Sequence, residues 1–170
     1  MRNRDYIRRL TVYALLTSLS MIFSYIESAV ALPLPVPGIK LGLANIVSLF
    51  LLYNGGLAGA LAVSAARCAL TSILFGTGLW QLAFSLSGAV LSLVGMYLIM
   101  KTGRFSIFLI SMAGGILHNA GQLLVAFFTI GGAAIGYYAP VLLLSGAVCG
   151  LITAACARAV FKVYKGGRIE

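Results

Sequence analysis

Ten of the twelve basic residues of this chain fall into three clusters that are separated by long apolar stretches. The clusters are Arg2, Arg4, Arg8 and Arg9, then Lys101 and Arg104, then Arg158, Lys162, Lys165 and Arg168. Basic residues that flank membrane spans stay on the cytoplasmic side, so an even number of spans is expected between any two clusters. Outside the clusters, Lys40 follows a proline-rich segment and Arg67 lies inside an apolar stretch, where a charge is costly. This pattern predicts a membrane protein with its functional site near these two exceptions.

Hydrophobic residues make up 61% of the 170 residues, and charged residues only 9%. Soluble domains use about 45–50% apolar and about 25% charged residues, so we predict a single integral membrane domain over residues 1–170. The net charge of +9 could indicate nucleic acid, but the basic residues flank apolar stretches and do not line one face with interleaved aromatics. Membrane topology explains the charge, and we expect no nucleic-acid partner.

Span lengths and Gly, Pro and charge punctuation predict an all-α fold, a bundle of six membrane helices. The predicted helices cover residues 7–30, 41–53, 55–75, 80–100, 105–130 and 138–163. The second is short for a span, and the alternating prolines of residues 32–38 exclude a helix there. With the N-terminus inside, ten basic residues lie inside and only Lys40 lies outside, so both termini are expected in the cytoplasm.

Small residues recur four positions apart in several of the predicted helices, at Ala14 and Ser18, Gly55 and Gly59, Gly88 and Ser92, and Gly146 and Gly150. Such pairs let helices approach closely in lipid, where association depends on packing. We interpret most of the pairs as packing within the bundle. The Ala14 and Ser18 pair is the exception, and we expect it to dock onto a partner.

Acidic residues number three, namely Asp5, Glu27 and Glu170, and two of them lie at the chain ends. No pair of carboxylates is available to hold Mg²⁺ or to perform general acid and base chemistry. The three cysteines lack metal-type spacing. We therefore expect neither catalysis by this chain nor a bound metal or cofactor.

Isolated polar residues inside the apolar stretches are the candidate site. Arg67 and His118 lie about 18–20 Å from the inner ends of their predicted helices, and His118 and Gln122 share one helix face. Two interpretations stay open: an Arg67–Glu27 ion pair within a hydrogen-bonded lock, or a cavity for an anionic ligand, a carboxylate or a phosphate. The candidate substrate-binding residues are Arg67, His118, Asn119 and Gln122, with Lys40 and Asn45 at the mouth. Glu27 belongs to the set either as a partner of Arg67 or as a ligand contact.

The segments around these residues resemble a known family. Residues 38–45 read GIKLGLAN, Arg67 lies in the third predicted span, residues 85–88 read SLSG and residues 115–122 read GILHNAGQ. Together they resemble the bacterial membrane proteins labelled heptaprenyl diphosphate synthase component I, also called the Gx transporter family. That family is similar to the substrate-binding S components of energy-coupling factor transporters, which are six-helix membrane proteins.

The resemblance implies a multi-pass protein of the bacterial cell membrane that captures a small substrate in an outward-facing pocket. It also implies docking through the first helix onto a transmembrane coupling subunit that two ATPases drive. The usual docking pattern is Ala-x-x-x-Ala, from which Ala14-x-x-x-Ser18 departs. One rival interpretation is a non-catalytic membrane subunit of a prenyl diphosphate or redox enzyme complex. A passive channel is the other, but the inner halves of the predicted helices are too apolar for a polar path.

Overall fold

The computed structural model describes residues 2–29, 42–76, 78–130 and 132–163, and every regular element in these ranges is an α-helix. The six helices are α1 (Arg2–Ala29), α2 (Leu43–Asn54), α3 (Gly56–Leu74), α4 (Gly78–Lys101), α5 (Ile107–Ile130) and α6 (Gly132–Val163). All of them except α2 are long and apolar enough to cross a membrane. The all-α prediction is therefore confirmed, and the chain is a multi-pass membrane protein.

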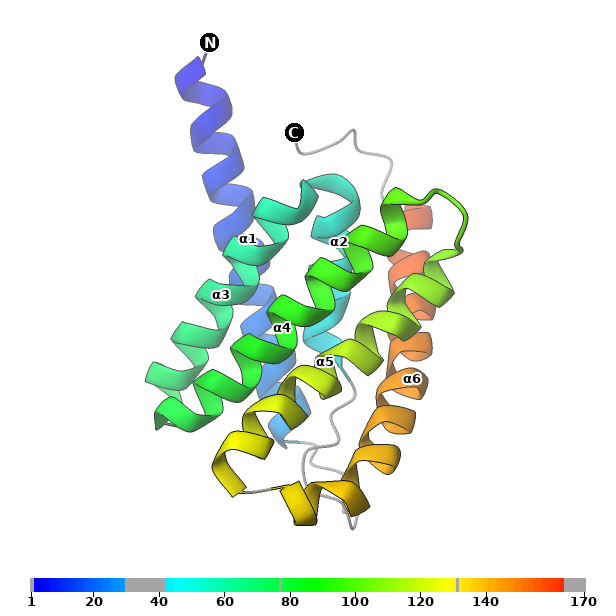
Figure 1. Ribbon diagram of the computed structural model, residues 1–170. Coiled ribbons are helices and arrows are strands. Elements are labelled where there is room, and N and C mark those ends of the chain that lie inside the picture. The colour runs from blue at the N-terminus through cyan, green and yellow to red at the C-terminus, as the bar shows by residue number, and fades with distance from the viewer. Residues whose placement is uncertain (1, 30–41, 77, 131, 164–170) are drawn as a thin grey trace.

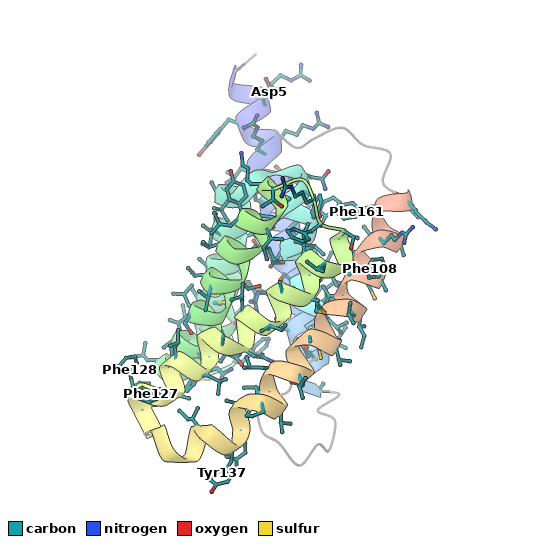
Figure 2. The ribbon with its side chains drawn as sticks, turned by 45° about the vertical axis from the view of Figure 1, so that its right-hand side comes forward. Asp5, Phe108, Phe127, Phe128, Tyr137 and Phe161 are labelled. Carbon is teal, nitrogen blue, oxygen red and sulfur yellow. The ribbon has the colours of Figure 1, made fainter. Side chains whose placement is uncertain are left out.

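Three helices begin earlier than the sequence predicted, α4 by two residues and α1 and α6 by five or more. The helix expected from residue 7 begins at Arg2. Arginine is a good helix former, so the helix continues past the end of the apolar span, and Asp5 stabilises its first turn. The helix expected from residue 138 begins at Gly132, with Pro140 inside it. In Figure 2 the first turns of α6 lie across the end of the bundle, and the helix turns upward beyond Tyr137. A proline removes one backbone donor and kinks a helix, and packed neighbours tolerate this in membrane bundles.

The beginning of α1, the α2–α3 turn, the α4–α5 connection and the end of α6 all lie at one end of the bundle (Figure 1). We call it the basic end, because Arg8, Lys101, Arg104 and Lys162 belong to these segments. The first turns of α1 stand clear of the other helices there, and residues 4–11 are all exposed. The α3–α4 and α5–α6 junctions lie at the opposite end.

The apolar core occupies the half of the bundle next to the basic end. The later turns of α2, α4 and α6 and the earlier turns of α3 and α5 contribute its side chains, and all of these turns lie toward that end. Side chains of α1, including Tyr13 and Leu16, pack against it from one side. The fully or almost fully buried members are Val47, Leu49, Leu51, Leu52, Ala60, Val63, Leu93, Met96, Ile110 and Ala157.

Glycines set the closest helix contacts. A Cβ atom on Gly115 of α5 would lie 2.0 Å from the backbone oxygen of Gly146 of α6, and one on Gly150 would lie 2.4 Å from the oxygen of Ser111. On the α4 side, a Cβ atom on Gly88 would lie 2.8 Å from the backbone oxygen of His118. These helices approach backbone to backbone, as small residues allow in lipid.

Candidate ligand-binding cavity

A cavity of about 330 Å³ lies among the helices, and all six of them contribute to its wall. Its lining comes from the end of α1, the beginning of α2, the later half of α3, and α4, α5 and α6 along their middle turns. Six of the seven predicted substrate-binding residues line this one cavity: Glu27, Asn45, Arg67, His118, Asn119 and Gln122. The seventh, Lys40, lies outside the described residues. The fold therefore brings together residues from four helices that the sequence grouped by depth alone.

Arg67 of α3 is the cation of the cavity wall and is only 8% exposed. Its Nη1 donates a hydrogen bond of 3.1 Å to Ser24 Oγ of α1. Its Nε is buried and has no hydrogen-bond partner among the residues that the structure describes. A buried donor without a partner costs about 1–3 kcal/mol, so this edge of the guanidinium can donate to an acceptor that the described residues do not supply.

Ser24 is the partner that the sequence analysis missed. Its hydroxyl donates to Ser20 O at 3.0 Å and accepts the hydrogen bond from Arg67, so it fixes the guanidinium against α1. Ser20 is buried, and Ser20, Ser24 and Glu27 recur at helical spacing. This polar stripe on an apolar helix was the available signal, because polar residues in membrane helices face the bundle interior.

Glu27 contacts the beginning of α2. Its Oε1 accepts a hydrogen bond from the backbone N–H of Gly42, the residue that precedes α2. A carboxylate is stabilised at a helix N-terminus by the unpaired N–H groups and the helix dipole. The sequence left open an ion pair of Glu27 with Arg67, whereas the hydrogen bonds described for the two side chains go to Gly42 and Ser24.

Gly42 joins three helices at the cavity. Besides its N–H bond to Glu27, its carbonyl oxygen accepts hydrogen bonds from the N–H of Asn45 at 2.9 Å and from Thr153 Oγ1 of α6 at 3.4 Å. Its φ of 78° lies in the left-handed region, which a side chain disfavours by roughly 1–2 kcal/mol. A glycine is thus required where α1, α2 and α6 meet.

The α5 residues form the opposite wall. Gln122 Nε2 and His118 Nε2 lie 3.4 Å apart on one helix face, as the spacing of four predicted. Asn119 Nδ2 donates instead to the backbone oxygen of Leu142 of α6, so this amide ties α5 to α6. Gly88 of α4 leaves room for the imidazole, since a Cβ atom there would lie 3.0 Å from two of its ring atoms.

The small-residue pairs differ in burial. Gly88 and Ser92, and Gly146 and Gly150, are buried at helix contacts. Ala14 and Ser18 are exposed on α1, and the Ser18 hydroxyl bonds to its own helix at Ala14 O. The face of α1 that carries them is therefore not used inside the bundle.

The cavity can hold a small anion or amphipath. Among the described residues, its charged groups are Arg67 and Glu27 and its other polar groups include amides, hydroxyls and one imidazole, while Tyr25, Phe75 and Met96 add apolar surface. Within the described ranges, no three His, Cys, Asp or Glu residues are grouped so that they could hold a metal ion.

A family model described as heptaprenyl diphosphate synthase component I matches residues 16–160 of the 170. The description names its members as one component of a synthase. No curated protein and no solved structure matches the chain. The matched region contains every helix from α2 to α5, the second half of α1, most of α6, and all of the cavity residues.

Proposed function

The chain belongs to the heptaprenyl diphosphate synthase component I family, and from that premise we propose that it captures a small anionic or amphipathic compound for ATP-driven uptake. In this role it is the substrate-binding S component of an energy-coupling factor transporter. A transmembrane coupling subunit and two ATPase subunits are its partners, and the bacterial cell membrane is its location. The basic end faces the cytoplasm, and the cavity opens to the outside.

The observation that carries the proposal is the division of the bundle along its axis. The cavity extends from the turns away from the basic end as far as Met96 and Ser111, where it meets the tightly packed apolar side chains of the core. A capture subunit needs a pocket that is closed on the cytoplasmic side. A channel needs a continuous polar path, which the buried leucines of α2 and α4 interrupt.

The exposed face of α1 supports the docking part of the proposal. α1 packs against α2 and α3, and its small pair Ala14 and Ser18 points away from them. The large residues beside the pair, such as Leu15 and Ile22, are exposed as well. A helix of a coupling subunit can therefore approach the α1 backbone closely at this point.

The chain on its own is proposed not to catalyse prenyl-chain elongation. Diphosphate chemistry with Mg²⁺ needs several carboxylates, and Glu27 is the one carboxylate that the described part of the chain places at the cavity. The cavity volume of about 330 Å³ is at the lower end of the roughly 300–1,000 Å³ typical of small-molecule sites.

The second candidate function is a non-catalytic membrane subunit of a prenyl diphosphate or redox enzyme complex, and the family's description favours it. Affinity purification from the native membrane separates the two functions. Uptake predicts co-purification of two ATPases with a coupling subunit, and loss of substrate uptake when the chain is deleted. Co-purification of a synthase or redox subunit without ATPases would select the second function.

The proposed orientation has its own test in cysteine labelling with an impermeant reagent. The tested sites are Gly103, in the α4–α5 connection, and Gly136, near the beginning of α6, and both are exposed. Each is replaced by cysteine in a variant without the native Cys68, Cys149 and Cys156. We expect intact cells to be labelled at position 136 and not at position 103, and the reverse pattern would contradict the orientation.

A further inference from the structure

We infer that the group bound by Arg67 is a carboxylate and not a phosphate, an inference that rests on the proposed function and narrows its substrate class. The first step is the shape of the free donor edge. Ser24 accepts a hydrogen bond from Nη1 of Arg67, and the buried Nε has no partner among the described residues. The Nε and Nη2 hydrogens lie side by side and fit two oxygens of one anion, and a carboxylate has no further oxygen that needs a donor.

The second step is the charge of the cavity. Within the described ranges, the charged groups that line the cavity are the Arg67 guanidinium and the Glu27 carboxylate, one of each sign. A carboxylate ligand adds one negative charge, whereas a phosphate monoester adds about 1.5–2 at pH 7. Excess negative charge is costly in a low-dielectric site, and the described residues supply a single cation to offset it.

The third step is the supply of donors. Seven serine and threonine side chains line the cavity, and five of them donate their single hydroxyl hydrogen to a backbone carbonyl. Asn119 donates one of its two amide hydrogens to Leu142 O. A phosphate monoester has three terminal oxygens that each need a hydrogen-bond donor. Because most of the hydroxyl hydrogens in the cavity wall already bond to backbone carbonyls, the wall can satisfy the two oxygens of a carboxylate more readily than three. The five committed hydroxyls are those of Ser24, Ser28, Thr71, Ser111 and Thr153.

The fourth step concerns the helix N-terminus at the cavity. The beginning of α2 would be the natural place for a phosphate, because its free N–H groups and dipole favour anions. Glu27 already accepts the N–H of Gly42 there. The protein's own carboxylate thus occupies the anion position, and the ligand is left with the side edge of Arg67.

The test uses two matched pairs of probes, acetate with inorganic phosphate and benzoate with phenylphosphate, at pH 8. Binding to the purified protein is measured by calorimetry and by the shift in melting temperature, with neutral benzamide as the isosteric control. We expect each carboxylate to bind about tenfold or more tightly than its phosphate partner, and Arg67→Gln to remove carboxylate binding.

Glu27→Gln sharpens the test, because glutamine keeps an oxygen that can accept the Gly42 N–H while the negative charge is lost. This variant should bind all four anions more tightly and narrow the gap between carboxylate and phosphate. Equal or tighter Arg67-dependent binding of the phosphates to the wild-type protein would overturn the carboxylate inference and leave the anion pocket of the proposed function intact. Failure of both anion classes to bind in an Arg67-dependent way would overturn both.

Discussion

The two halves of this bundle are made by the same helices and yet differ in almost every physical respect. In the half next to the basic end, α2, α3, α4 and α5 meet through leucine, valine, isoleucine and alanine side chains, several of them completely buried. In the other half, the same helices present an arginine, amides and hydroxyls to a cavity of about 330 Å³. One Arg67 donor there has no partner among the described residues.

This difference separates the roles of the halves. Close apolar packing contributes stability and closes one side of the bundle. The cavity half is less closely packed and contains a buried donor without a described partner, and both features lower the stability of the fold. Such local costs are typical of sites that bind a ligand. Substitutions should therefore have opposite profiles: large stability effects with little effect on binding in the core, and large binding effects with little effect on stability at the cavity.

Leu93→Ala should have the largest effect on stability. Leu93 of α4 is 1% exposed within the core, so its truncation leaves a void that the rigid neighbours cannot fill. We expect the free energy of unfolding in detergent to fall by about 2–5 kcal/mol. Leu98→Ala on the same helix is the matched control, because Leu98 is 61% exposed and should cost little. Equal losses in the two variants would contradict the assignment of the core.

Gly42→Ala should have the next largest effect. The left-handed φ of 78° disfavours a side chain, and the added Cβ atom would lie 3.4 Å from Thr153 Oγ1. We expect a loss of about 1–2 kcal/mol in the free energy of unfolding, together with weaker anion binding because the Glu27 contact shifts. Gly136→Ala provides the control, since Gly136 lies in α6 with open space around its Cβ position and should tolerate alanine.

Arg67→Met should change stability by less than about 1 kcal/mol in either direction, because it removes one hydrogen bond to Ser24 and, with it, a buried Nε donor that has no partner among the described residues. Anion binding measured by calorimetry should nevertheless be lost. Arg67→Lys keeps the charge without the planar fork, and we expect it to bind carboxylates more weakly than the wild-type protein does. Unfolding of Arg67→Met at room temperature would indicate that the arginine is a structural lock.

Ala14→Leu combined with Ser18→Leu should have the smallest effect on the isolated protein. Both positions are exposed on α1, so neither half of the bundle needs to adjust. We expect unchanged unfolding and anion binding, with loss of co-purification of the coupling subunit and of ATP-driven uptake. A parallel loss of anion binding would place the pair within the packing of the bundle.

The fold was predictable because apolar length and charge placement leave a membrane chain few choices. The prediction was wrong about where α1 and α6 begin. The arginines that follow Met1 and the proline at position 140 lie inside these helices, and a membrane bundle tolerates a proline there. Arg67 and His118 were grouped because they lie at a similar distance from the inner ends of their predicted spans. In the structure both residues line one cavity. That these residues bind a ligand remains a prediction.

What the sequence could not supply was the pairing of individual atoms. It offered Glu27 as a partner of Arg67, because opposite charges in a membrane are expected to meet. Among the described hydrogen bonds, Arg67 donates to Ser24 and Glu27 accepts from the N–H of Gly42. Such choices depend on the rotation of α1 and on the place where α2 begins, neither of which a hydropathy pattern fixes.

Native mass spectrometry of the protein extracted from its own membrane tests the central claim, that the cavity around Arg67 binds a small anion. The wild-type protein should retain a small molecule with an acidic group at one copy per chain. The Arg67→Met variant should lack it, while the variant with Ala14→Leu and Ser18→Leu should retain it. An identical bound mass in the Arg67→Met variant, or an empty wild-type protein that also binds none of the anion probes, would contradict the claim.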